Sequence, residues 1–114
     1  YLVCSYYGPQ KTADGYKKAA DQFNRCGDIC KQRGMRFAYH NHSYSFVPVD
    51  GQMGQDIMMQ GTDAALVDFE MDMYWVKVAG QEPMTWMKKY PSRFRLCHVK
   101  DRSATRPADK PESV

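Results

Sequence analysis

The sequence lacks three features that would each place it in a familiar class: a long apolar run, a basic stripe and closely paired cysteines. No hydrophobic stretch approaches the roughly 18 residues that cross a membrane, so we expect no membrane partner. The net charge of +3 is small, and no basic cluster alternates with aromatic residues, so we expect no nucleic-acid partner. The overall composition is that of an ordinary globular protein, with 43% hydrophobic and 25% charged residues.

The cysteines are too few and too scattered for a disulfide framework, with 4 in 114 residues and none in a CxxC pair. Cys26 and Cys30 are four residues apart and would share one face of a helix, where they could form a metal pair. Two small buried side chains are the better interpretation of this spacing. The cysteine content favours a reducing compartment. For localisation we expect the cytoplasm or the periplasm of a bacterium, a choice that no feature of this segment decides.

Predicted strands and helices alternate along the chain. Short runs rich in β-branched and aromatic residues predict strands at 1–7, 35–40, 64–72 and 94–99. Apolar residues at three- and four-residue steps predict an amphipathic helix from Thr12, its N-cap, to Gly34, its C-terminal glycine. Shorter helical segments are predicted at 52–60, 75–79 and 83–90, the last with Pro83 in its first turn.

The predicted strand centres lie 28 to 34 residues apart, which is the length of one βα unit. Parallel strands joined by such crossovers build either a (β/α)₈ TIM barrel or a flavodoxin-like open sheet, and the spacing alone fits both. The fold class is therefore α/β, and about four βα units correspond to part of a barrel. We expect residues 1–101 to form this partial barrel domain and residues 102–114 to be a polar loop or disordered tail.

Three residues able to bind a metal end successive predicted strands. His40 ends the second strand, Asp72 the third and His98 the fourth. Parallel strands end at one mouth, so these side chains should converge there. Two imidazoles and a carboxylate suit one divalent ion, either Mn²⁺, Zn²⁺, Co²⁺ or Fe²⁺, although a histidine at a strand end can also be purely structural.

The third predicted strand alternates acidic and apolar residues. Asp68, Glu70 and Asp72 share one face of the strand, and the residues between them are apolar. In a barrel the apolar face would pack on the helices, and the acids would point inside. Glu70 lies one layer below Asp72, so it could orient a ligand as an outer-sphere residue. It could equally pair with Arg36.

Three short motifs stand out in the sequence, namely YHNH at 39–42, FEMDMYW at 69–75 and CHVKD at 97–101. In their order and spacing they resemble the sugar phosphate isomerase/epimerase family of xylose-isomerase-like barrels. The resemblance implies strands four to seven of a (β/α)₈ barrel, a sugar substrate and one divalent metal ion. In the better-known epimerases the ligands are Glu, Asp, His and Glu on strands five to eight.

Asp72 and His98 match the family's Asp and His, whereas His40 stands where the strand-five Glu would be. In this the chain resembles a subset of these barrels that reads YHNH at that position. The strand-eight Glu has no counterpart in the sequence. Because His40 replaces one of two carboxylate bases, the resemblance implies a one-base reaction such as aldose–ketose isomerisation, or elimination beside the ketone of a keto-glycoside. The strand-eight Glu would be the natural base, and His42 is the candidate within this chain.

Three further residues are candidates for contact with a sugar. Lys100 would point to the same side as His98 and bind a substrate oxyanion or phosphate, or else pair with Asp101. Trp75 would stack on a sugar face, or else pack under its helix. Asn41 would contact substrate, or hold neighbouring loops through its amide.

The predicted function is therefore metal-dependent proton transfer beside a sugar carbonyl. Alternatives are a keto-glycoside lyase or hydrolase, an endonuclease-IV-like phosphodiesterase, and a non-catalytic binding module. The phosphodiesterase would need more ligands and a more basic face than this chain has. Four βα units leave open strand edges, so we expect residues 1–114 alone to be neither stable nor active. Homo-oligomer formation stays open.

Overall fold

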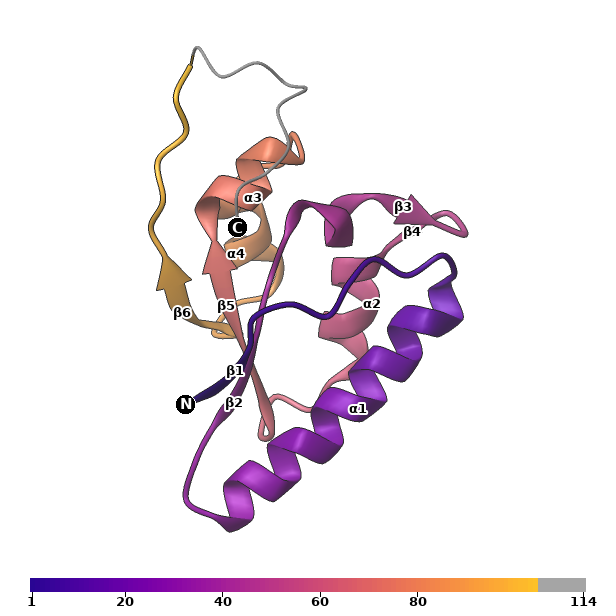
Figure 1. Ribbon diagram of the computed structural model, residues 1–114, viewed down its shortest axis with the longest axis vertical. Helices are drawn as coiled ribbons and strands as arrows, with labels where there is room; N and C mark the ends of the chain where they lie inside the picture. The colour runs from indigo at the N-terminus through magenta and orange to yellow at the C-terminus, as the bar shows by residue number, and fades with distance from the viewer. Residues whose placement is uncertain (105–114) are drawn as a thin grey trace.

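The computed structural model describes residues 1–104 and contains a four-stranded parallel sheet (Figure 1). Its strands, in the order in which they pair, are β1 (Leu2–Cys4), β2 (Phe37–His40), β5 (Val67–Asp72) and β6 (Phe94–His98). All three pairings are parallel, and sheet order follows chain order without a reversal. Doubly wound open sheets reverse direction at a switch point, whereas a barrel wall does not. The fold is therefore part of a TIM barrel.

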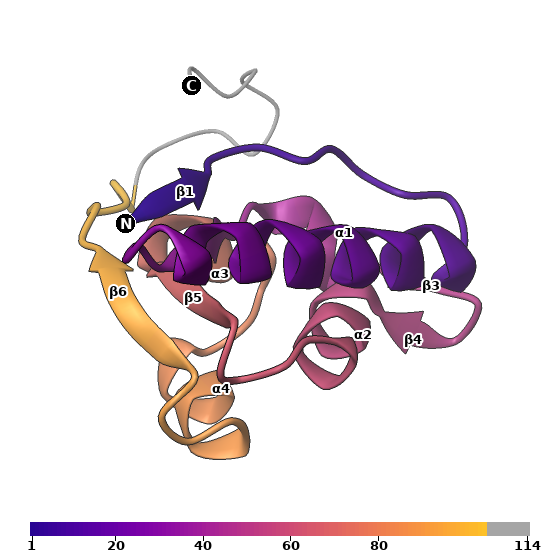
Figure 2. The same ribbon diagram turned by 90° about the horizontal axis from the view of Figure 1, so that it is seen from below.

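The helices pack on one face of this sheet (Figures 1 and 2). They are α1 (Ala13–Gln32), α2 (Gly54–Gly61), α3 (Met73–Val78) and α4 (Pro83–Lys89). The predicted caps of α1 are confirmed, because the side chain of Thr12 accepts a hydrogen bond from Gly15 N and Gly34 has a φ of 71°. In the part of the chain that the structure describes, no helix is both long and apolar enough to span a membrane.

The core lies between the sheet and α1. Val67, Phe69 and Met71 of β5 are fully buried, and so are Tyr16 and Phe23 of α1. The predicted alternation of β5 is confirmed, because its apolar residues enter the core while Glu70 and Asp72 line the opposite face. The cysteines are free.

Two local elements were not predicted from the sequence. A 3₁₀ helix, η1, spans Ser43–Phe46, and a short antiparallel hairpin pairs β3 (Pro48–Val49) with β4 (Gln52–Met53). Asp50 and Gly51 make the turn with positive φ, a conformation that suits Gly and Asp. Arg102 to Ala104 lie in no helix or strand, and the rest of the predicted polar tail is outside the described residues.

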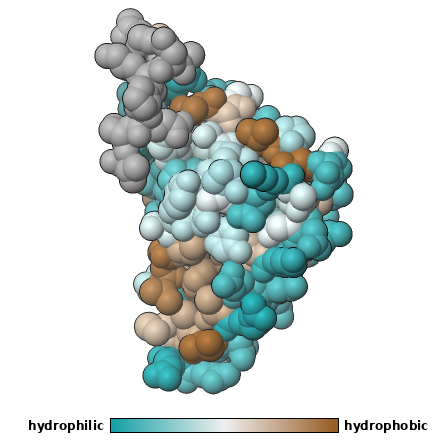
Figure 3. Space-filling model, turned by 45° about the vertical axis from the view of Figure 1, so that its right-hand side comes forward, coloured by the Kyte–Doolittle hydropathy of each residue, from teal (hydrophilic) through white to brown (hydrophobic). Residues whose placement is uncertain are grey.

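The strands at the two ends of the described sheet each have one paired neighbour. On β1, Leu2 is 52% exposed, and Tyr1 just before it is 58% exposed. Figure 3 shows hydrophobic side chains gathered on one face of the molecule beside a hydrophilic surface. Strands of a closed barrel are paired on both sides, so these exposed edges fit a chain that forms only part of one.

An ion pair at the start of β5 corrects one sequence expectation. Arg36 pairs with Asp68 and not with Glu70, through Nε to Oδ2 at 2.9 Å and Nη2 to Oδ1 at 2.6 Å. The Tyr1 hydroxyl donates to the same carboxylate at 2.9 Å. Burial acts to raise the pKa of Asp68, but the hydrogen bonds from Arg36 and Tyr1 and the charge of Arg36 hold it below its usual range.

Asp68→Asn should therefore lower the free energy of unfolding at pH 7 by about 1 kcal/mol, a value that allows for the solvent exposure of Arg36. A depressed pKa stabilises the fold above the unfolded-state value of about 3.9, and this contribution is lost as the pH falls through the folded-state value. Denaturant unfolding of the full-length protein at several pH values should show wild type and variant converging below about pH 4. A gap that stayed constant at low pH would contradict this.

Candidate metal centre and active site

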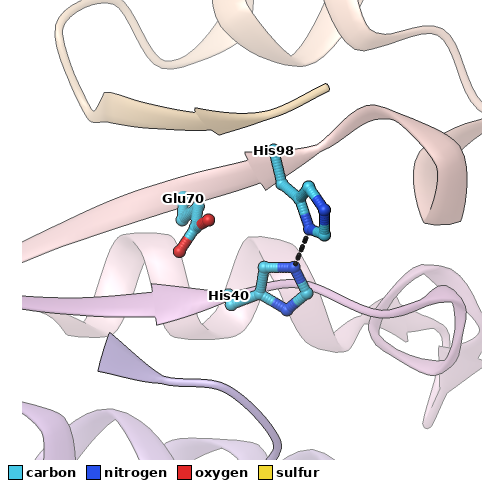
Figure 4. A group of neighbouring side chains, drawn as sticks. All are labelled: His40, Glu70 and His98. Carbon is cyan, nitrogen blue, oxygen red and sulfur yellow. Dashed lines mark hydrogen bonds between the residues drawn. The ribbon is translucent and has the colours of Figure 1, made fainter. Parts of the chain in front are cut away.

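Three side chains that the sequence predicted to converge do meet at the carboxyl edge of the sheet. Asp72 Oδ2 lies 3.0 Å from His40 Nε2 and 3.0 Å from His98 Nδ1. The two imidazole nitrogens are 3.3 Å apart, a contact that Figure 4 marks between His40 and His98. One residue comes from the end of each of β2, β5 and β6, so the parallel register brings them together.

Asp72 holds its position through both carboxylate oxygens. It is fully buried as the last residue of β5 and the N-cap of α3. Its Oδ1 accepts a hydrogen bond from Trp75 N at 3.1 Å, which leaves Oδ2 facing the two histidines. The helix start therefore fixes which oxygen points at the imidazoles.

The spacing of these three atoms fits one divalent ion. Ligand atoms each about 2.1 Å from an ion lie about 3.0 Å apart at right angles and about 3.4 Å apart in a tetrahedron. The separations of 3.0, 3.0 and 3.3 Å fall in this range. Nitrogen and oxygen donors together also suit Zn²⁺, Mn²⁺, Co²⁺ or Fe²⁺.

Glu70 supplies a second carboxylate at the same place. It is half-buried on β5, and Figure 4 shows it beside His40 and His98. Ligand atoms of these three residues lie within 4.8 Å of one another, so they too could hold a metal ion. Sequence reasoning gave Glu70 only an orienting role, because the reach of its longer side chain cannot be read from strand alternation.

A cavity of about 680 Å³ opens over this group of side chains. Tyr6, His42, Trp75 and Lys100 form part of its wall. Tyr6, with its neighbours from the end of β1, was not predicted. It carries no metal-ligand chemistry, and only its place after the first strand could have indicated it.

His42 lies among aromatic rings at this wall. Its ring stacks on Tyr44 at 5.7 Å and lies 5.5 Å from Trp75 and 5.0 Å from His40, measured between centroids. Its Nδ1 is buried without a hydrogen-bond partner among the described residues. Burial lowers the pKa of His42, electrostatic interactions with His40 and Lys100 lower it further, and the charge of Asp72 opposes them.

The ammonium of Lys100 lies over two aromatic rings, 4.5 Å from the centroid of Tyr74 and 5.2 Å from that of Trp75. These cation–π contacts hold a positive charge at the cavity. Trp75 itself is only 4% exposed, so most of its ring packs inside the fold. Its stacking on a sugar stays a prediction.

Asn41 is buried behind the cavity and is not among the residues that line it. Its Nδ2 donates to Asp72 O at 3.2 Å, and its Oδ1 accepts from Asp72 N at 2.9 Å. Its contact with substrate stays a prediction, whereas its amide does hold a neighbouring strand.

The chain is similar to known proteins in fold and in sequence. No family model matches the chain. Two crystal structures of sugar phosphate isomerase/epimerase proteins from Parabacteroides distasonis ATCC 8503 share its fold. One is 36% identical with a TM-score of 0.84, covering 88% of this chain and 38% of the other. The second is 32% identical with a TM-score of 0.85, covering 98% and 44%.

Curated relatives include inosose dehydratases of Bacillus thuringiensis (strain Al Hakam) and Bacillus cereus (strain 03BB102). Each is 30% identical over 93 residues, which is 82% of this chain. The chain spans 30% of the length of these relatives. The fold, the solved neighbours and these relatives agree with the resemblance carried by the three motifs: the chain has the fold of part of a TIM barrel, and its structure is similar to sugar phosphate isomerase/epimerase proteins.

Proposed function

We propose that the chain contributes the metal-binding part of an enzyme that transfers a proton at the carbon beside a sugar carbonyl. The observation that carries this proposal is the convergence of His40 Nε2, Asp72 Oδ2 and His98 Nδ1 within 3.3 Å at the edge of a cavity. His40 Nε2 and His98 Nδ1 both lie 3.0 Å from the same Asp72 oxygen and 3.3 Å from each other, which is the spacing expected of three atoms that bind one metal ion.

His40, Asp72 and His98 would hold one divalent ion, with Glu70 as a further carboxylate donor nearby. When bound, the ion polarises a substrate carbonyl and stabilises the negative charge that develops on its oxygen. Lys100 would add a positive charge beside that oxygen. His42, whose imidazole lines the cavity and whose pKa is lowered by burial, is the candidate base within this chain.

The names of the relatives indicate two outcomes of this first step. The solved neighbours are named as isomerases or epimerases, and the curated relatives as dehydratases acting on an inosose. Isomerisation returns the proton to carbon, whereas dehydration beside a carbonyl expels a hydroxyl group after the same proton has left. The dehydratase names support elimination from a keto-sugar or related polyol ketone as the second candidate.

His98→Ala tests the proposal in the full-length protein. Wild type should hold nearly one Mn, Zn, Co or Fe ion per chain by elemental analysis, and the variant should hold almost none. Wild type with metal should also exchange a carbon-bound proton of a ketose or inosose substrate in D₂O, as seen by NMR. The variant should not, because the carbonyl is no longer polarised.

A surface histidine is not available as a control, so Lys18→Ala on the exposed side of α1 serves instead. It should leave both metal content and exchange unchanged. No metal in wild type would refute the proposal. Sugar binding without any exchange would favour the non-catalytic binding module.

A further inference from the structure

Asn41 ties together the two strands that carry His40 and Asp72. It follows His40 directly at the end of β2, and its side chain crosses to the backbone of Asp72 on β5. It is 1% exposed. Both ends of its amide are used, one as a donor to Asp72 O and the other as an acceptor from Asp72 N.

The side-chain amide of Asn41 extends the hydrogen bonding between β2 and β5 beyond the last backbone pair. The parallel pairing of β2 with β5 ends where His40 lies opposite Glu70. Beyond that point the chain leaves the sheet towards η1, while β5 runs on to Asp72. The N–H and C=O of Asp72 would then lack partners on this side, which is costly for buried groups. The primary amide of Asn41 replaces the missing peptide unit, because it offers one donor and one acceptor.

We infer that Asn41 is a positioning residue, which sets the distance between His40 and Asp72 and so tunes the affinity of the site for its metal ion. The inference rests on the proposed function. Asn41 would act through Asp72, since both ends of its amide are bound to the backbone of that residue. Its neighbour in sequence is one metal ligand and its hydrogen-bond partner is the other, so one side chain fixes their relative position.

The chemistry at this position requires both a donor and an acceptor. An aspartate would present only acceptor oxygens to the carbonyl of Asp72 and would repel it. An alanine would leave the N–H and C=O of Asp72 unpaired on this side. Outer-sphere partners of metal ligands typically change affinity by about 10- to 100-fold when they are removed.

The test measures binding of Co²⁺ alone to the metal-free, full-length protein, by chelator competition and by the visible absorption of the bound ion. Asn41→Ala should bind Co²⁺ about 10- to 100-fold more weakly than wild type, with shifted absorption bands because the ligands are differently placed. Thr62→Val is the matched control. It also removes a buried side-chain hydrogen bond to backbone, from Thr62 Oγ1 to Met58 O at 2.8 Å, but lies outside the cavity. Its affinity and spectrum should match wild type.

Asn41→Ser retains a hydroxyl able to make one of the two bonds, and it serves if Asn41→Ala does not fold. Its affinity should fall between those of wild type and the expected alanine value. If Asn41→Ala and Asn41→Ser fold and bind Co²⁺ with the affinity and spectrum of wild type, the inference is overturned and the proposed function stays intact. An equal loss in Thr62→Val would overturn it as well, because the effect would then follow from stability. Absence of Co²⁺ binding in wild type would overturn both.

Discussion

Asp72→Asn should weaken Co²⁺ binding to the full-length protein by more than about 100-fold, since loss of an outer-sphere partner alone costs about 10- to 100-fold. The asparagine can keep its carbonyl oxygen towards Trp75 N and so preserve the N-cap of α3. Its NH₂ group then faces His40 and His98, where a metal needs a lone pair. The fold should survive while the metal site is lost, which chelator competition and circular dichroism can measure together.

Glu70→Gln is the matched carboxylate-to-amide control on the same strand. Asp72 Oδ2 lies 3.0 Å from both histidine nitrogens. The ligand atoms of Glu70, His40 and His98 lie within 4.8 Å of one another, which is a looser group. We therefore expect Glu70→Gln to weaken Co²⁺ binding by no more than about 10- to 100-fold, as loss of an outer-sphere partner would. A larger loss in Glu70→Gln than in Asp72→Asn would contradict this assignment and make Glu70 the principal carboxylate ligand.

The convergence of His40, Asp72 and His98 could be predicted from sequence because it depends on few assumptions. Each residue ends a predicted strand, and parallel strands of one sheet end at the same edge. Strand alternation likewise predicted that Val67, Phe69 and Met71 enter the core, which they do. These inferences need only the direction of a strand and the side on which a residue lies.

Other features depend on distances that strand patterns do not contain. Arg36 pairs with Asp68, whereas Glu70 was its possible partner from the sequence. Which of the two acids pairs with Arg36 depends on how far its long side chain reaches along β5. The contact of Asn41 with Asp72 depends on β2 ending before β5 does. Tyr6 reaches the cavity from a loop after β1, and its place follows from the path of that loop.

The close approach of α1 to the start of β5 leads to the second large expected effect. Gly27→Ala should lower the free energy of unfolding by about 3 kcal/mol, at the upper end of the usual cost of overpacking. A Cβ at Gly27 would overlap the carbonyl oxygen of Leu66 and lie 2.8 Å from its carbonyl carbon. This is backbone at the entry to β5, so it cannot move aside as the end of a side chain would. Denaturant unfolding of the full-length protein measures the change.

Gly15→Ala in the same helix separates this clash from helix propensity. Alanine is favoured over glycine inside a helix by about 1 kcal/mol, and this gain applies to both variants. A Cβ at Gly15 would meet only the side chain of Gln10, whose Oε1 at 2.9 Å can rotate away and whose Cβ at 3.0 Å has to give by only a few tenths of an ångström. We therefore expect Gly15→Ala to stay within about 1 kcal/mol of wild type. Equal stability of the two variants would show that α1 can shift away from Leu66. A loss confined to Gly27→Ala would show that the helix rests directly on the backbone leading into β5, the strand that carries Glu70 and Asp72.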